Sequence, residues 1–156
     1  MTLEQTKDFD RFFLYLFNQL LTKEEQLIQK KHKTDLTIRE LHVIEAADVL
    51  SKTAQNTMAN ISKRLYITPS SLTGSVNQLI HKRYLTKHSP ISDKRVSLVE
   101  LTDKGKRVLR AHQAFHDELV QFIQQDAGPE QTELILSSLE KASQLLMQKI
   151  QQAAGE

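Results

Sequence analysis

The chain has 156 residues, a formal net charge of +2 and no cysteine. This length fits one domain with a helical appendage, and the lack of thiols excludes a disulfide framework and a cysteine-based redox sensor. The apolar run near the N-terminus is too short for a signal peptide or a membrane span, so we expect a cytoplasmic protein.

Two helices are predicted before the middle of the chain. The first covers residues 6–33. Its apolar side chains spread over more than one face, so we expect a partner subunit to bury some of them. Glu24 interrupts its main apolar stripe, which consists of Phe13, Phe17, Leu20, Leu27 and Ile28. The second helix begins after Thr37, which forms a capping box with Glu40, and it ends near Leu50.

A helix-turn-helix pattern follows. Thr57 caps a short helix, and Thr68 with Pro69 begins a second helix that runs to about residue 82. The inward positions of this second helix are apolar, while its outer face is small, polar and free of carboxylates. A helix that enters the major groove of DNA has this character. The candidate contacts to base edges and nearby phosphates are Ser70, Ser71, Thr73 and Asn77.

Gly74 lies on the same outer face. Its cost in helix propensity, about 1 kcal/mol relative to alanine, indicates that something requires a residue without a side chain. Close approach of the backbone to DNA and close packing of another helix both account for it at this stage.

A β-hairpin is predicted over residues 85–101, with strands at 85–89 and 96–101 and a turn at 90–95. A helix-turn-helix followed by a two-stranded wing is the winged-helix plan. Residues 63–110 contain eleven lysines and arginines against three acidic residues, a balance of +8 in a chain of +2. Such asymmetry is typical of a phosphate-binding face on an acidic body, although a merely solvated basic surface is the alternative.

Two further helices complete the chain. The first begins after Thr102 and runs to about residue 126, Gly128 and Pro129 break it, and the second covers about residues 129–153. We therefore expect a mainly α fold, one winged helix-turn-helix domain over 1–156. Residues 37–110 form its winged helix-turn-helix DNA-binding unit, which we call the reading unit, and the helix over about 69–82 is its reading helix. Helices in 1–35 and 126–156 form a dimer core. Such a homodimer binds a pseudo-palindromic operator; a monomer whose termini pack on themselves is the alternative.

The wing and the start of the following helix carry a specific motif. Asp93-Lys94-Arg95 is followed after five residues by Leu101-Thr102 and after two more by Gly105. This pattern resembles the wing of the MarR family of bacterial transcription regulators, and the resemblance covers nearly the whole chain. It implies that Arg95 enters the minor groove and that Asp93 orients Arg95. By their charge alone, six other basic residues are interpreted as phosphate contacts or solvated charges: Lys63, Arg64, Lys82, Arg83, Lys94 and Arg107.

Within that family, the chain is most similar to the fatty-acid-biosynthesis repressors of Gram-positive cocci, and then to zinc-responsive repressors. The first likeness implies an acyl effector. The second implies a zinc site, because four potential ligands match: Glu24, His42, His112 and His116. His112 and His116 are four residues apart, on one helix face. The set suits tetrahedral zinc, but a buried polar network explains it equally. Contact with an organic effector is a third, less favoured interpretation.

The sequence therefore predicts a sequence-specific DNA-binding regulator, a repressor that requires no cofactor and responds to an acyl or metal effector. An enzyme is not expected, because the four ligands would fill the coordination of zinc and leave no position for water. Motifs for phosphate loops and nucleophile elbows are also missing. The alternative from another class is an architectural DNA-binding protein without sequence preference.

Overall fold

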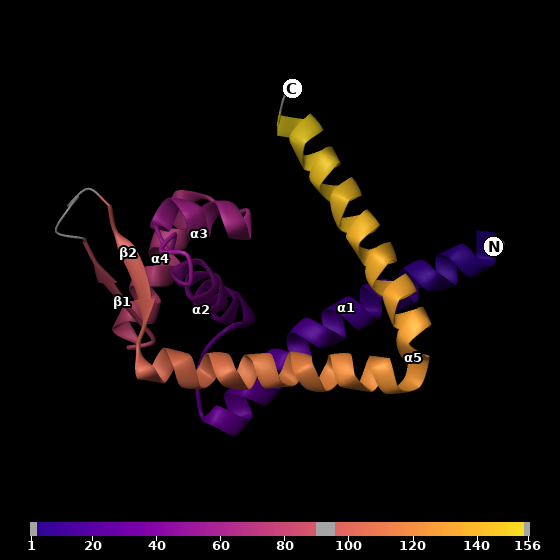
Figure 1. Ribbon diagram of the computed structural model, residues 1–156, viewed down its shortest axis with the longest axis horizontal. Coiled ribbons are helices and arrows are strands. Elements are labelled where there is room, and N and C mark those ends of the chain that lie inside the picture. Colours follow the sequence, from indigo (N-terminus) through magenta and orange to yellow (C-terminus); the bar gives the residue numbers. More distant parts are fainter. Residues whose placement is uncertain (1–2, 90–95, 155–156) are drawn as a thin grey trace. The chain divides into compact units, whose positions relative to one another are not determined.

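Figure 1 shows the computed structural model, which describes the backbone of residues 3–89 and 96–154. The chain divides into two compact units, residues 1–113 and 114–156, and each is described by itself. Within the described residues, no helix combines the length and the apolar character needed to cross a membrane.

The first unit contains the predicted elements in the predicted order. They are α1 (Leu3–His32), α2 (Ile38–Ser51), α3 (Met58–Leu65), α4 (Pro69–His81), β1 (Leu85–His88), β2 (Leu98–Leu101) and the first turns of α5 (Asp103–Ala154). The strands are shorter than expected at the turn side of the hairpin. The mainly helical fold with a two-stranded wing is confirmed.

Side-chain caps explain where the helices begin. Thr37 accepts a hydrogen bond from the Glu40 amide at 3.3 Å, and Glu40 accepts one from the Thr37 amide at 2.9 Å, which confirms the capping box. Thr57 and Thr68 cap α3 and α4 in the same way. These starts depend only on residues that are close in sequence, and the sequence identified them correctly.

Helix α2 is the centre of the first unit, because it contacts α1, α3, α4 and β2. Leu41 and Ile44 of α2 are almost completely buried. The apolar positions predicted for α4 belong to the same core. The other elements contribute Ile28, Leu36, Ile61, Leu85, Val99, Val108 and Leu109.

The wing is fastened to the segment before α3. Strands β1 and β2 pair antiparallel, with Leu85 opposite Leu101 and His88 opposite Leu98. Asn56 is buried. Its side-chain amide donates to the backbone carbonyl of Val99 at 2.8 Å, and its backbone carbonyl accepts from the Val99 amide at 2.9 Å. In the sequence Asn56 is one member of a polar loop, and no local pattern indicates this role.

The second unit consists of the rest of α5. Gly128 interrupts it with φ 74° and ψ 171°, and Pro129 follows. Figure 1 shows the resulting bend between the orange and yellow parts of α5. Thr132 donates to the Gly128 carbonyl at 2.7 Å, which satisfies a backbone group at the break. The predicted interruption of the helix is confirmed.

Candidate nucleic-acid interface

Helix α4 presents the predicted reading residues on its outer face. Thr68 accepts a hydrogen bond from the Ser71 amide at 3.3 Å, so the helix begins at Pro69. Leu72, Val76 and Leu79 are buried, which fixes the rotation of the helix about its axis. That rotation leaves all four predicted contact residues exposed: Ser70, Ser71, Thr73 and Asn77.

The hydroxyl groups on this face are partly engaged by the helix itself. Thr73 donates to the Pro69 carbonyl at 2.8 Å and Ser75 donates to the Ser71 carbonyl at 3.2 Å. Each hydroxyl oxygen retains acceptor capacity, while the Asn77 amide offers both donors and acceptors. Asn77 is therefore the residue of this face best equipped to read a base edge.

The surroundings of Gly74 separate the two explanations for it. Among the described residues, a Cβ added at Gly74 would meet no atom within 4 Å. Packing of another helix within the chain therefore does not account for the glycine. Its place on the exposed face is compatible with close approach by an external partner.

The turn before α4 is held by Ser62. This residue is buried, and its hydroxyl donates to the Ile67 carbonyl at 2.6 Å. Tyr66, which ends α3, has a left-handed φ of 53° and is 67% exposed. A tight turn with one positive-φ residue sets the angle between α3 and α4.

The start of α5 explains part of the wing motif. Thr102 accepts a hydrogen bond from the Gly105 amide at 3.1 Å, which confirms the predicted cap. A Cβ at Gly105 would lie 2.3 Å from the Tyr84 carbonyl oxygen, so only glycine allows this approach. The Thr102 amide donates to the same carbonyl at 3.1 Å. Thr102 and Gly105 thus join the wing to the end of the reading helix.

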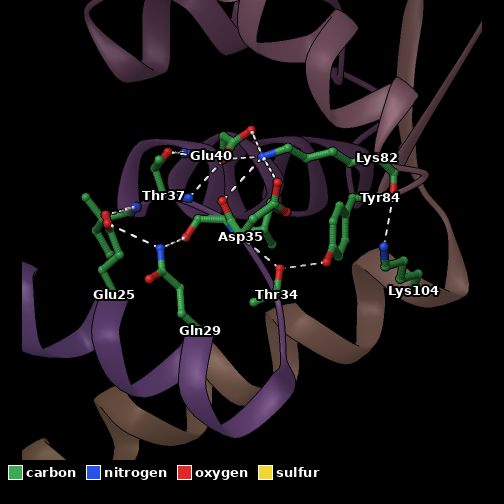
Figure 2. Close-up of polar contacts among 11 residues, drawn as sticks. Glu25, Gln29, Thr34, Asp35, Thr37, Glu40, Lys82, Tyr84 and Lys104 are labelled. Carbon is green, nitrogen blue, oxygen red and sulfur yellow. Dashed lines mark hydrogen bonds and ion pairs between the residues drawn. The ribbon is translucent and has the colours of Figure 1, made fainter.

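Lys82 corrects a prediction. The sequence predicts that Lys82, like the other basic residues of this region, is a phosphate contact or a solvated charge. Lys82 is neither: its side chain is 15% exposed and lies 3.0 Å from Glu40 Oε1 and 3.1 Å from Asp35 Oδ2. Figure 2 shows this ion-pair cluster at the beginning of α2. The sequence missed it because the partners are 42 positions apart.

Electrostatics around Lys82 favour its charged form. Burial opposes the charge, but hydrogen bonds with Glu40 and Asp35 outweigh it and raise the pKa of Lys82. The hydrogen bond from Lys82 also lowers the pKa of Asp35. The cluster therefore connects the end of α4 to α2 through the ion pair of Lys82 with Glu40.

The other basic residues differ in position. Lys63, Arg64, Arg83 and Arg107 are exposed, as a phosphate-binding or solvated role requires. Asp93, Lys94 and Arg95 lie outside the described residues, so their part in the wing remains a prediction.

A second cluster surrounds His112. Glu24 and His112 are almost completely buried, and the Glu24 carboxylate contacts His112 Nδ1. His112 Nε2 lies 3.6 Å from Glu45 Oε2, and the His42 and His112 rings are 5.9 Å apart. Of the predicted metal ligands, Glu24 and His112 are in direct contact, and the His42 ring packs beside that of His112. Glu45 is an addition that the ligand pattern did not include.

The protonation state of His112 matters for both interpretations of the cluster, a metal site and a buried polar network. Burial by itself lowers its pKa, but Glu24 and then Glu45 outweigh burial and raise the pKa to about 9. His112 is therefore an imidazolium at neutral pH, ion-paired with Glu24. A metal would have to displace that proton, because only neutral imidazole is a ligand.

His116 follows His112 by one turn of α5 and belongs to the second unit. Its ring contacts Phe115, with centroids 5.5 Å apart. The other three predicted ligands, Glu24, His42 and His112, lie in the first unit.

Comparison with solved structures identifies relatives of the whole chain. FabT of Streptococcus pneumoniae, in complex with DNA, has a TM-score of 0.81 and 29% identity, and the match covers 92% of this chain and 98% of FabT. MepR of S. aureus in complex with DNA has a TM-score of 0.70 and 20% identity over 88% of this chain and 97% of MepR. No family model and no curated protein matches the sequence.

MarR of Staphylococcus aureus, in complex with salicylate and kanamycin, has a TM-score of 0.71 and 18% identity over 94% of this chain and 95% of that one. MepR and this MarR show the same fold, while FabT is more similar in sequence. These similarities show the winged-helix fold, and the structures of FabT and MepR that carry it contain DNA. The similarity to FabT, at 29% identity over nearly the full length of both chains, agrees with the resemblance to the MarR family that the wing motif carries.

Proposed function

We propose that this protein is a repressor that binds a pseudo-palindromic operator as a homodimer. The observation that supports it most is the outer face of α4, where four exposed polar residues and Gly74 form a surface without a carboxylate. FabT and MepR have been solved in complex with DNA, and we extend DNA binding by this fold to the present chain. DNA as the ligand also implies a cytoplasmic location.

Asn77 is proposed to contact a base edge, with Ser70, Ser71 and Thr73 contacting bases or nearby phosphates. Asn pairs bidentately with adenine, and serine or threonine hydroxyls serve several bases. The exposed Lys63, Arg64 and Arg83 supply phosphate contacts, which makes binding strongly dependent on salt. At the wing tip, Arg95 enters the minor groove, Asp93 orients it and Lys94 lies beside the backbone.

Exposed apolar side chains support the dimer. In α1, Phe9, Phe12 and Phe17 are each more than half exposed. The second unit exposes Phe122, Leu134, Leu136, Leu145, Leu146 and Ile150 to the same extent. Patches of this kind mark protein–protein interfaces, so residues 1–35 and 126–156 are proposed as the dimerisation helices around the reading unit 37–110.

Selection from random DNA with the purified protein tests this function. We expect one enriched motif with two inverted half-sites about one helical turn apart. Asn77→Ala should weaken binding to that motif by about 1–3 kcal/mol and relax preference at one position per half-site. Gln78→Ala, the exposed neighbour, is the control. Binding without sequence preference would instead identify an architectural DNA-binding protein.

An acyl species is the first candidate effector, because of the resemblance to fatty-acid repressors. Zinc is the second candidate, because the potential ligands Glu24 and His112 are buried in contact with each other. Calorimetry with chelator-treated protein separates them: a sub-micromolar zinc site lost in His112→Ala/His116→Ala identifies a metal-linked regulator. No zinc binding, or binding that the variant retains, removes zinc as the effector of this cluster. Operator binding is then measured with and without long-chain acyl ligands.

A further inference from the structure

We propose that a pocket beside Tyr84 binds the phosphoryl group of a small anionic ligand. The pocket lies within the first unit and has a volume of about 210 Å³. It is smaller than the roughly 300–1,000 Å³ of drug-sized sites, so it suits a small anion or the phosphate end of a metabolite. Its lining residues are His32, Thr34, Tyr84, Lys104, Arg107 and Val108.

The charged side chains that line this pocket are basic. Lys104 and Arg107 are three positions apart in the first turns of α5, which places them on the same helix face. His32 enters from the end of α1. Among the described residues, the lining includes no carboxylate. The nearby Asp35 pairs with Lys82 at 3.1 Å. The N-terminal end of α5 adds its own positive potential, which also favours an anion.

The donors are held in place before a ligand arrives. Lys104 Nζ donates to the Lys82 carbonyl at 3.0 Å and lies 4.0 Å from the centre of the Tyr84 ring, which leaves two of its N–H groups for other acceptors. The Thr34 and Tyr84 hydroxyls are 2.7 Å apart. One hydrogen bond between them uses one hydroxyl hydrogen, so the other can donate to a ligand. Figure 2 shows these three side chains.

This set of donors fits a phosphoryl group better than a carboxylate. The guanidinium of Arg107 and the ammonium of Lys104 come from α5, while the hydroxyls come from the segment after α1 and from the residue before β1, so donors approach from more than one side. A phosphoryl group offers three terminal oxygens and up to two negative charges, whereas a carboxylate offers two oxygens in one plane. Arginine with a second cation is a common arrangement for phosphate.

The position of Tyr84 shows what a bound anion would stabilise. Tyr84 lies between the reading helix and the wing, and its amide donates to the Leu79 carbonyl at 2.8 Å. Thr34 lies just after α1. An anion that accepts from the free O–H of this hydrogen-bonded pair, together with Lys104 and Arg107, therefore connects the end of α1 to the junction of α4 and β1. Its binding should raise the melting temperature of the protein.

The test titrates the full-length protein with inorganic phosphate, without DNA and at constant ionic strength set by sodium chloride. Thermal unfolding and ³¹P line width are measured. We expect saturable binding that chloride does not reproduce and acetate reproduces only weakly. Arg107→Gln should weaken it about tenfold or more, the loss of one charge-assisted contact. Arg107 is exposed, so this variant should fold.

Arg110→Gln is the matched control, because Arg110 is exposed on the same helix and does not line the pocket. Its phosphate affinity should stay within about twofold of the wild type. Thr34→Val should weaken binding and leaves every charge in place. A titration without saturation, or equal affinities for Arg107→Gln and Arg110→Gln, would overturn the proposal.

A phosphate of the DNA backbone could occupy the same pocket. Measurements of operator binding distinguish it from a free phosphorylated ligand. If the pocket takes a free ligand, Arg107→Gln and Arg110→Gln should bind the operator with equal affinity and equal dependence on salt. If Arg107→Gln alone loses affinity and shows a shallower salt dependence, the pocket holds a DNA phosphate and the proposal of a free ligand is wrong.

Discussion

Gly74 and Gly105 both lie in helices, yet their surroundings are opposite. Among the described residues, an added Cβ at Gly74 would meet nothing within 4 Å, whereas one at Gly105 would lie 2.3 Å from the Tyr84 carbonyl oxygen. Gly74 lowers the helix propensity of α4, and no contact among the described residues requires a glycine there. The second is required by a backbone contact that joins α5 to the end of the reading helix.

The two alanine variants should therefore change stability in opposite directions. We expect Gly105→Ala to lower the free energy of unfolding by about 1–3 kcal/mol, because backbone atoms must move apart. Gly74→Ala should raise it by up to about 1 kcal/mol and weaken operator binding, since its methyl group lies between the helix and DNA. Urea denaturation followed by circular dichroism and a DNA-binding titration measure both. Unchanged operator affinity of Gly74→Ala would contradict the proposed approach.

His112 should make stability depend on pH. Its pKa rises from an ordinary 6.5 to about 9 in the folded protein, because ion pairing with Glu24 and Glu45 outweighs burial. The folded state thus binds a proton more tightly than the unfolded state does. This stabilisation is complete below pH 6.5 and is lost as the pH rises through about 9, with a decrease of roughly 1–3 kcal/mol in the free energy of unfolding.

Urea denaturation between pH 6 and pH 10 measures this decrease. His112→Gln should remove most of the slope between pH 6.5 and 9, while His88→Gln, on the exposed part of the wing, should retain it. A wild-type stability that is flat over this range would show that His112 is not held as an imidazolium.

At the scale of elements, the Lys82 cluster connects the end of α4 to the beginning of α2. Glu40 is 6% exposed in its side chain and also closes the capping box of α2. One carboxylate thus serves a helix start and a long-range ion pair. Because α2 is central to the first unit, the cluster helps to set the orientation of the reading helix against the core.

Lys82→Met should lower the free energy of unfolding by about 3 kcal/mol, because Glu40 remains buried without its cation. Lys87→Met, an exposed position on β1, should change it by less than about 0.5 kcal/mol. Glu40→Gln in the Lys82→Met background should recover part of the loss, since glutamine keeps the capping box without the charge. Equal effects of the two lysine variants in urea denaturation would show that the pair contributes nothing.

At the scale of the whole molecule, α1 combines two surfaces. Its C-terminal half contributes Ile28 and Glu24 to the interior of the first unit, while Phe9, Phe13 and Phe17 follow one another at contact distance along an exposed stripe. A stripe of aromatic rings in water is unfavourable, and a second copy of the chain is the partner that the proposed function requires.

The double variant Phe13→Glu/Phe17→Glu should therefore be monomeric in sedimentation experiments. The helical circular dichroism should be retained, because these rings lie outside the buried core. Operator affinity should fall by about tenfold or more, since two linked reading helices bind far better than one. Gln26→Glu, an exposed position on the same helix, is the control. A double variant that remains dimeric would place the interface elsewhere.

The sequence by itself determined the order and nearly all the limits of the helices, the wing and the break at Gly128. Caps such as Thr37 with Glu40 and the spacing of apolar residues act within a few positions, so they can be read directly. The motif around Leu101, Thr102 and Gly105 indicated the resemblance to the MarR family for the same reason. The roles of Asp93 and Arg95 remain predictions.

Only the tertiary structure decided which charges meet. Lys82 was interpreted as a phosphate contact or a solvated charge, and that was wrong, because its partner Glu40 is 42 positions away and α2 packs against α4. Glu24 and His112 are separated by 88 positions, and the sequence left a metal site and a buried polar network open for them; only the packing shows that the two side chains are buried in contact. Such pairs depend on how helices pack, which local patterns do not encode, and packing therefore determines which charges are buried and which remain available to DNA.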